Sequence, residues 1–245
     1  MNSIGGNQGV GGPIPRNSIG GENFIRHIGS DKLIYDFKSG NGTKVIDKSR
    51  EGNDGTLASG VAAPTWKRNG LYFDGGDYVT LDSGVSSALG GVGIASFAFF
   101  ANRGVIGTQE ALVSMIFAAD NKILVNFQPT NELRVGGRTV NGDTFQSKTT
   151  TAKFTDAEKF YSIVGVLDIT NDDIYIYVDG VLQPTTGTPA WTNTAFGADV
   201  GAEYLSSNAS NYFDGTMKNV NFVYRRLSQI EIQQHYLSNK FKGNN

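Results

Sequence analysis

The chain has 245 residues, a net charge of −2 and no cysteine. This length fits one large β-sandwich or two small domains. The absence of cysteine excludes disulfides and cysteine-ligated zinc, and it favours folding in a reducing compartment. Nucleic acid binding needs several clustered cations, and the largest basic cluster is Arg225-Arg226, so we expect no nucleic acid partner. The first twenty residues lack the features of a signal peptide, and the most apolar stretch, 94–101, is too short to cross a membrane.

Residues 1–31 are predicted to form a glycine-rich arm ahead of a single sandwich domain over 32–245. The pentapeptide Asn-Ser-Ile-Gly-Gly occurs at 2–6 and again at 17–21. Such a segment cannot bury enough surface to offset its chain entropy, so one interpretation is a disordered leader. The alternative is an assembly arm that becomes ordered on a sister subunit or a larger particle. Its apolar contacts would come from Ile4, Pro13, Ile14, Pro15 and Ile19.

From Lys32 onward, short apolar runs alternate with turn sequences. Candidate strands cover 33–37, 44–46, 56–57, 70–73, 78–81, 95–101, 111–118, 123–127, 133–135, 160–167, 173–178 and 181–182. The Asp-Gly-Gly-Asp turn at 74–77 is predicted to make a hairpin of its two flanking strands, and Asp-Gly at 179–180 is typical of a type I′ hairpin. About a dozen short strands at this spacing favour an all-β, two-sheet antiparallel sandwich. Its core is expected to contain Phe73, Val79, Phe97, Phe99, Val164, Val178 and Phe222.

One short C-terminal helix is predicted after an alternating apolar run over 217–224. Ser228 can accept from the backbone N–H of Glu231, and Glu231 can reach back to the N–H of Ser228, which is a capping box. Leu227 before the cap and Ile232 after it can form a hydrophobic staple. The helix over 228–239 is expected to pack through Ile232, Tyr236 and Leu237.

Four segments resemble the laminin-G-like and pentraxin-like domains of the concanavalin A-like superfamily. They cover 40–57, 69–81, 172–182 and 213–236, in the order expected for that family. The resemblance implies a jelly-roll sandwich closed by a short helix. This fold hosts lectins, hydrolases and structural modules, so function has to be argued from the site.

The resemblance also implies a possible calcium site, because such domains often bind calcium through loop carboxylates and carbonyls. Calcium takes six to eight oxygen ligands. The candidate ligands are Asp74, Asp77, Asp172 and Asp173. The alternative interpretation is that these aspartates only form turns. No other cofactor is expected.

The acidic residues do not predict catalysis. A retaining glycosidase needs two carboxylates roughly 5–5.5 Å apart, and no two of the seven glutamates are near neighbours. His27 and His235 lie in the arm and the terminal helix without a serine-acid context, so a hydrolytic triad is not expected. Sugar binding would use exposed aromatics on rim loops, and Trp191 with Tyr204, in the polar stretch 189–211, is the candidate pair. The alternative is that these rings pack within the sandwich or at an oligomer interface.

Two functions fit these observations. The first is a non-enzymatic virion structural protein of a bacteriophage: a capsid decoration, fibre or tail adhesion module assembled in the host cytoplasm. Its arm would bind other virion proteins or sister subunits, and its sandwich would bind a surface or glycan. The alternative is a carbohydrate-binding module or adhesin at a bacterial cell surface or outside the cell.

Overall fold

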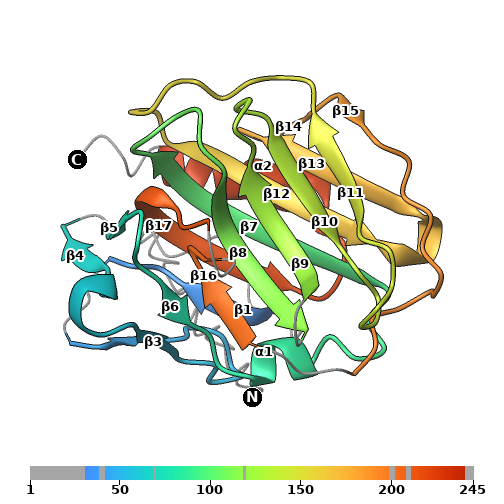
Figure 1. Cartoon of the computed structure of the whole chain (residues 1–245), viewed down its shortest axis with the longest axis horizontal. Coiled ribbons are helices and arrows are strands. Elements are labelled where there is room, and N and C mark those ends of the chain that lie inside the picture. The colour runs from blue at the N-terminus through green and yellow to red at the C-terminus, as the bar shows by residue number, and fades with distance from the viewer. Residues whose placement is uncertain are drawn as a thin grey trace, which may run out of the picture.

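The computed structural model describes residues 31–38, 42–68, 70–117, 120–198, 202–207 and 211–240. Within this part of the chain, antiparallel sheets of eight and nine strands form a sandwich (Figure 1). The predicted all-β class is confirmed. The residues proposed for the arm lie outside the described ranges: Ile4, Pro13, Ile14, Pro15 and Ile19.

Each sheet draws its strands from distant parts of the chain. The eight-stranded sheet contains β1 (Asp31–Tyr35), β4 (Thr65–Lys67), β5 (Gly70–Asp74), β7 (Ile94–Arg103), β12 (Tyr161–Asp168), β13 (Asp173–Val178), β14 (Val181–Leu182) and β17 (Asp214–Val223). Its order is β14-β13-β12-β7-β17-β5-β4, with β1 also paired to β17. The nine-stranded sheet contains β2 (Lys44–Val45), β3 (Gly55–Leu57), β6 (Val79–Thr80), β8 (Glu110–Phe117), β9 (Asp120–Phe127), β10 (Leu133–Gly137), β11 (Gln146–Thr150), β15 (Thr185–Thr186) and β16 (Ala202–Leu205). Its order is β15-β11-β10-β9-β8-β16-β6-β3-β2.

The described helical segments lie in connections or, in the case of the C-terminal helix, against the outer side of the eight-stranded sheet. They are the 3₁₀ turns η1 (Gly60–Ala62) and η2 (Ile169–Asn171) and the helices α1 (Gly84–Ser87) and α2 (Gln229–Lys240). No described helix has the length and apolar character needed to span a bilayer.

The two predicted hairpins have different outcomes. Asp179 and Gly180 take positive φ angles of 51° and 80°, and β13 pairs directly with β14, as a type I′ turn requires. The hairpin predicted around 74–77 is wrong, because β5 lies in the eight-stranded sheet and β6 in the nine-stranded sheet. The turn is instead a corner where the chain passes from one sheet to the other. Strand partners depend on the whole sandwich, which a local turn sequence does not encode.

The predicted core is largely confirmed. Buried between the sheets are Phe73, Val79, Phe97, Phe99, Val178 and Phe222. Val164 is also buried, but in a second cluster on the outer side of the eight-stranded sheet, together with Ile232 of α2. All residues of β12 are buried, so polarity does not distinguish the two faces of this strand.

The predicted capping box at the start of α2 is confirmed. Ser228 Oγ accepts from the N–H of Glu231 at 3.3 Å, and Glu231 Oε2 accepts from the N–H of Ser228 at 2.8 Å. Leu227 and Ile232 are buried in the same cluster, as a hydrophobic staple requires. The chain therefore enters this helix as its local sequence predicts.

The packing face of α2 differs from the prediction. Ile232 is buried as expected and Tyr236 is half-buried, but Leu237 is 43% exposed and His235 is buried instead. His235 Nδ1 lies 2.8 Å from the buried Ser162 Oγ, and burial lowers the pKa of this imidazole to about 4. His235, three residues after Ile232, lies on the same face of the helix, whereas Leu237, five residues after Ile232, lies on another face and is directed toward solvent.

Candidate functional site

The candidate site lies at the corner where the chain passes from β5 to β6. The N–H of Asp74 donates to Asp77 Oδ2 at 3.0 Å, and the N–H of Gly76 donates to Asp74 Oδ1 at 3.1 Å. Gly75 has a φ of 86°, which glycine adopts without a steric cost. The sequence at 74–77 therefore folds into a tight corner that holds two carboxylates.

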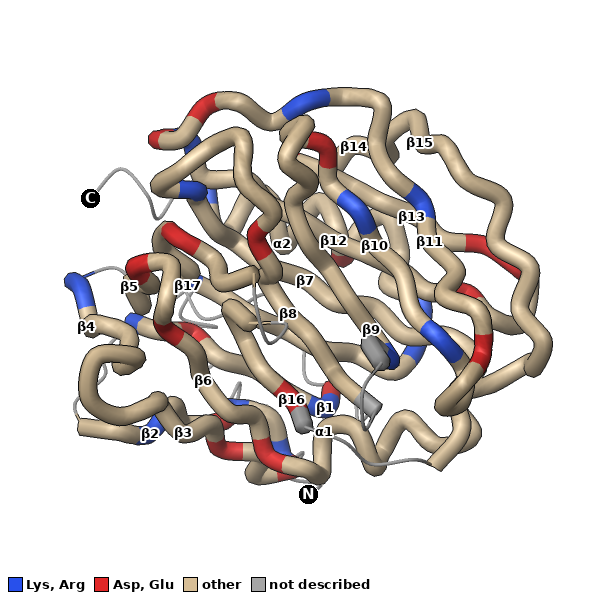
Figure 2. Tube along the Cα trace, in the orientation of Figure 1, with Lys and Arg blue, Asp and Glu red and all other residues tan. Residues whose placement is uncertain are grey.

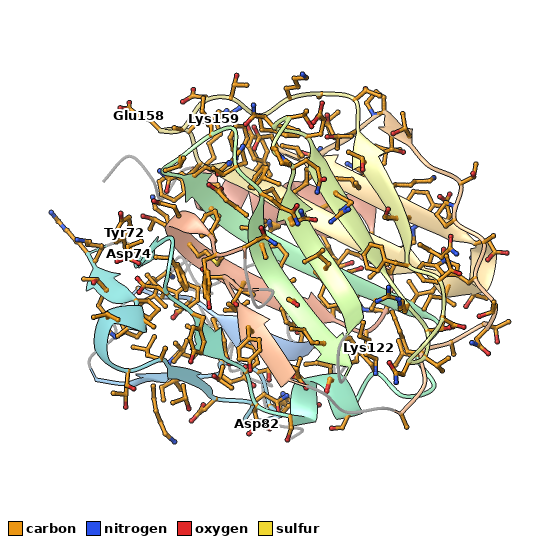
Figure 3. The ribbon with its side chains drawn as sticks, viewed as in Figure 1. Tyr72, Asp74, Asp82, Lys122, Glu158 and Lys159 are labelled. Atoms are coloured by element: carbon orange, nitrogen blue, oxygen red, sulfur yellow. The ribbon has the colours of Figure 1, made fainter. Side chains whose placement is uncertain are left out.

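Asp214 adds a third carboxylate, because it is the cross-strand partner of Asp74 at the start of β17. Burial raises the pKa of Asp214, and the charge of Asp74 raises it further. Burial also raises the pKa of Asp77 to about 6, and both neighbouring aspartates add to this effect. Figure 2 shows acidic positions near β5 and β17, and Figure 3 places Tyr72 and Asp74 at this edge. The charge of Asp214 is the main reason why the pKa of Tyr72 is raised. The corner is therefore a region of negative potential.

The four aspartates proposed as calcium ligands do not come together. Asp74 and Asp77 lie at the corner, whereas Asp172 and Asp173 lie where η2 meets β13. Asp172 Oδ1 accepts from the N–H of Trp191 at 2.8 Å, and Asp173 forms an ion pair with a lysine of β11. Among the described residues, no group of three or more histidine, cysteine, aspartate or glutamate side chains is placed to hold a metal ion. Calcium binding stays a prediction.

Tyr204 lies on strand β16 rather than on a rim loop, so the expected loop over 189–211 is wrong at this position. Its ring lies 5.4 Å from that of Tyr78 in an edge-to-face arrangement, and the ring of Tyr212 lies 6.5 Å from Tyr78. All three side chains are half-buried. Glu203 and Leu205, the neighbours of Tyr204, are buried, so Tyr204 points away from the core. We call Tyr78, Tyr204 and Tyr212 the tyrosine cluster.

Trp191 is not part of this cluster, so the predicted aromatic pair is not formed. The connection from β15 to β16, which carries Trp191, follows the right-hand edge of Figure 1, whereas β16 lies inside the sheet. Trp191 is half-buried and packs against the core between the sheets. Its position matches the alternative interpretation, in which the ring contributes packing.

A hollow of about 420 Å³ opens beside the corner, between the loop at 104–109 and the segment that precedes β17. We call it the rim pocket, and it is lined by Gly75, Val105, Thr108, Gln109, Glu110, Asn211, Tyr212 and Asp214. Tyr212 belongs to both the pocket and the tyrosine cluster. The rim pocket therefore presents an aromatic ring next to amide, hydroxyl and carboxylate groups.

A buried ion pair supports the rim pocket. Arg103 Nε donates to Glu110 Oε2 at 2.9 Å, and both side chains are almost completely buried. Thr108 Oγ1 donates to the other oxygen of Glu110 at 2.9 Å. Arg103 also donates to Asn131 Oδ1, which accepts from the N–H of Gly107 at 2.8 Å. Burial raises the pKa of Glu110, although the charge of Arg103 opposes this shift. These bonds anchor the loop at 104–109 to the sandwich.

Sequence reasoning missed three residues of this site: Tyr78, Tyr212 and Asp214. The sequence offers signals for them, because Tyr78 directly follows Asp77. Tyr212 directly precedes the segment 213–236 that carries the family resemblance, and Asp214 is its second residue. Their proximity depends on the pairing of β5 with β17, which are far apart in the chain. The sequence alone does not indicate that the segments around β5 and β17 are neighbours in space.

Comparison with solved structures identifies the same fold in several proteins. The sialidase of Trypanosoma rangeli matches with a TM-score of 0.65 at 16% identity, over 89% of this chain and 34% of its own. This chain thus spans about a third of the length of that sialidase. Domain 4 of AbnA, a GH43 extracellular arabinanase from Geobacillus stearothermophilus in complex with arabinotriose, matches with 0.63 at 15%, over 84% of this chain and 98% of the domain. The receptor binding domain of botulinum neurotoxin C/D mosaic serotype matches with 0.61 at 13%, over 85% of this chain and 51% of its own.

At these identities the structural likeness shows a shared fold and does not carry over an activity. Among curated proteins, no sequence matches this chain significantly. A family model described as the concanavalin A-like lectin/glucanases superfamily matches residues 73–233. That range covers most of the sandwich, including the corner, the tyrosine cluster and β17. The chain therefore belongs to the concanavalin A-like lectin/glucanases superfamily.

Proposed function

We propose that this chain is a non-catalytic attachment module that binds a glycan at the rim pocket. The observation that carries the proposal is a hollow of about 420 Å³ whose lining includes Tyr212, Gln109 and Asp214. A sugar ring presents an apolar face that packs on an aromatic ring, and its hydroxyls exchange hydrogen bonds with amides and carboxylates. The volume falls within the range of known ligand pockets.

The hydrogen bonds that hold the wall of the rim pocket favour a binding role over a catalytic one. Glu110, a buried acid of the lining, is held by Arg103 and Thr108 through both of its oxygens. Both oxygens of this carboxylate are used in holding the loop at 104–109, which favours a structural role for Glu110. A preorganised wall lowers the entropy lost when a ligand binds.

We expect a glycan array probed with the full chain to retain a defined set of neutral oligosaccharides, with arabinotriose included as one probe. Tyr212→Ala removes the aromatic wall and should weaken binding of the best oligosaccharide about tenfold or more. Isothermal titration calorimetry measures the loss. Tyr175→Ala, which removes another half-buried tyrosine on the outer side of the eight-stranded sheet and outside the rim pocket, is the matched control and should bind normally. An array without any retained glycan, or unchanged affinity in the Tyr212 variant, would contradict the proposal.

We further propose that the module belongs to a virion, where the segment 1–30 contacts a sister subunit or another particle protein. The glycine-rich repeat and the lack of cysteine support this context, as does the attachment role of the sandwich. The alternative proposal is a bacterial carbohydrate-binding module or adhesin. Both proposals share the rim pocket, so the segment 1–30 is what distinguishes them.

Deleting residues 2–30 is expected to leave the sandwich intact, because β1 begins at Asp31 and keeps its pairing with β17. Its thermal midpoint should change by less than about 2 °C, the scale of a fraction of a kcal/mol for a domain of this size. In sedimentation velocity, the full chain should form a defined oligomer and the truncated chain a monomer. If both chains sediment alike, the segment does not bind a sister subunit; if the truncated chain also joins the particle as well as the full chain does, the segment is not an assembly element.

A further inference from the structure

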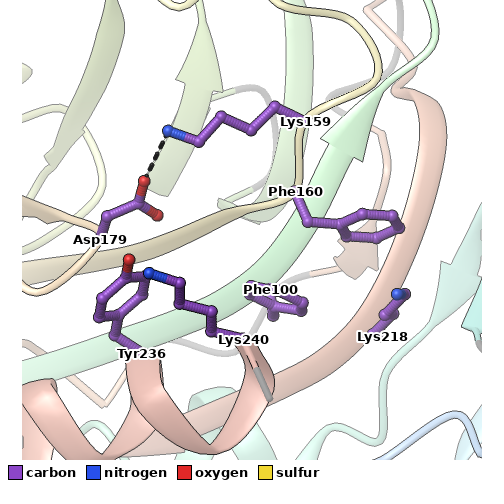
Figure 4. A pocket seen from close by; sticks show the side chains of 7 residues that line it. All are labelled: Phe100, Lys159, Phe160, Asp179, Lys218, Tyr236 and Lys240. Carbon is purple, nitrogen blue, oxygen red and sulfur yellow. Dashed lines mark ion pairs between the residues drawn. The ribbon is translucent and has the colours of Figure 1, made fainter. Parts of the chain in front are cut away.

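A second hollow, of about 430 Å³, lies beside the C-terminal half of α2 on the outer side of the eight-stranded sheet (Figure 4). We call it the lysine pocket, and it is lined by Phe100, Lys159, Phe160, Asp179, Lys218, Tyr236 and Lys240. These residues come from β7, the segment before β12, the β13–β14 turn, β17 and α2. It shares no residue with the rim pocket, and Figure 3 shows Lys159 apart from Asp74.

The lysine pocket carries more positive than negative charge. Lys159 Nζ forms an ion pair with Asp179 Oδ2 at 2.8 Å, and Asp179 is the one carboxylate among the described residues that line the pocket. Within the described part of the chain, Lys218 and Lys240 form no ion pair with a carboxylate, and their ammonium groups face aromatic rings instead. Among the described residues, no carboxylate therefore compensates these two positive charges of the pocket.

Lys218 is the more buried of these two cations. Its Nζ lies 3.8 Å from the centroid of the Phe160 ring, and the side chain is half-buried. Burial lowers the pKa of Lys218, which is the expected effect when an ammonium group loses water. A ring face compensates an ammonium only in part. An anion that enters the hollow would supply the missing counter-charge.

The rings give the pocket an apolar wall. Phe100 and Phe160 are stacked with centroids 5.4 Å apart, and Phe100 is only 4% exposed, so it supports Phe160 from below. Phe160 itself is half-buried and faces the hollow. A free inorganic anion would use the lysines but not this wall. A ligand that uses both has an anionic group carried on a ring.

We propose that the lysine pocket binds an acidic sugar residue, whose ring carries a carboxylate or a sulfate ester. Lys218 contacts the anionic group, Lys240 supplies a second cation at the mouth, and the sugar ring packs on Phe160. This site goes beyond the neutral glycan site at the rim pocket and differs from it in ligand charge and location.

The test is a titration of the isotopically labelled full chain, followed by NMR, at low ionic strength. The probes are glucuronic acid against glucose, and N-acetylglucosamine 6-sulfate against N-acetylglucosamine. We expect each acidic sugar to bind about tenfold or more tightly than its neutral counterpart, the usual scale of a hydrogen bond to a charged group. Added salt should weaken this preference, because it screens the lysines.

Lys218→Gln and Lys240→Gln should each weaken binding of the acidic sugars several-fold, while thermal midpoints stay near that of the native chain. Lys67→Gln is the matched control, since Lys67 is an exposed lysine 5.2 Å from the ring of Tyr72 and lies outside the pocket. If Lys218→Gln unfolds the chain, Lys240→Gln carries the test, because Lys240 is exposed on the helix.

Equal binding of acidic and neutral sugars, or unchanged affinity in both lysine variants, would overturn the proposal. Sodium sulfate that binds as tightly as the sulfated sugar would overturn the role of the ring. Tyr212→Ala should leave glucuronic acid binding intact, so failure of the rim pocket as a glycan site does not remove this inference. Conversely, if the acidic sugars do not bind at the lysine pocket, neutral glycan binding that depends on Tyr212 would still support the rim pocket as a glycan site.

Discussion

Phe222→Ala is expected to lower the free energy of unfolding by roughly 3–5 kcal/mol, the usual result of emptying a phenylalanine site in a core. Phe222 is fully buried between the sheets, and its ring lies 5.0 Å from Phe97 and 6.0 Å from Phe99, both edge-to-face. Its strand, β17, pairs with β7 at the centre of the eight-stranded sheet. The cavity would therefore open where neighbouring strands cannot collapse into it. Urea unfolding followed by circular dichroism measures the effect.

Leu237→Ala is the matched control for this prediction. Leu237 is a large apolar residue that the sequence placed on the packing face of the helix, but it is 43% exposed. Its truncation should cost less than about 0.5 kcal/mol, as for most surface substitutions. If the thermal unfolding midpoint of Phe222→Ala lies within a degree of that of the native chain, the register of β17 against β7 is not the one described.

Arg103→Met is expected to cost roughly 3–5 kcal/mol at neutral pH, because it leaves Glu110 buried without its cation. Both partners are almost completely buried and joined at 2.9 Å, and the guanidinium also lies 4.4 Å from the ring of Phe127. Methionine fills much of the space without the charge. The same change should weaken glycan binding, because Arg103 holds Asn131, which anchors the backbone of the loop at 104–109.

The loss of stability caused by Arg103→Met should depend on pH. Burial already raises the pKa of Glu110, and Arg103 opposes that shift, so its removal raises this pKa further. A carboxyl with a raised pKa in the folded state stabilises the protein fully below its unfolded pKa, near 4.5, and this contribution is lost as pH rises through the folded value. The free energy of unfolding of the variant should therefore be closer to that of the native chain at pH 4.5 than at pH 8.

Arg103→Met combined with Glu110→Gln removes the uncompensated charge and should recover part of the lost stability. The double variant should also show a smaller pH-dependent deficit than the single variant. An equal deficit at both pH values in Arg103→Met would show that the loss comes from packing and not from the buried carboxylate.

Local features of the structure could be predicted from sequence wherever nearby residues decide them. The capping box of Ser228 and Glu231 joins residues three apart, and both of its hydrogen bonds form. Asp179 and Gly180 form their type I′ turn because these two residue types tolerate positive φ. Ile174 and Tyr175 are adjacent in β13, so the period of two of a strand puts them on opposite faces, with the isoleucine in the core and the tyrosine on the outer side. In each case the physical cause lies within a few residues of the feature.

The candidate site was predicted only in part. Asp74, Asp77 and Tyr204 belong to the corner and the tyrosine cluster, although they were assigned to two different ligands. Trp191 packs against the core elsewhere. The lysine pocket was not predicted, because its residues come from five separate segments and none of them forms a motif.

The sequence by itself determined the all-β class, most of the strands and the identity of the core, since these follow from alternation, turn chemistry and apolarity. Only the tertiary structure decided that the turn at 74–77 crosses between the sheets and that Asp214 pairs with Asp74. It also decided that Lys218 lies beside Phe160 without a carboxylate partner among the described residues. Strand pairing across long separations sets these neighbours, because each strand is selected by the fit of the whole sandwich and a turn between two strands does not specify their partners.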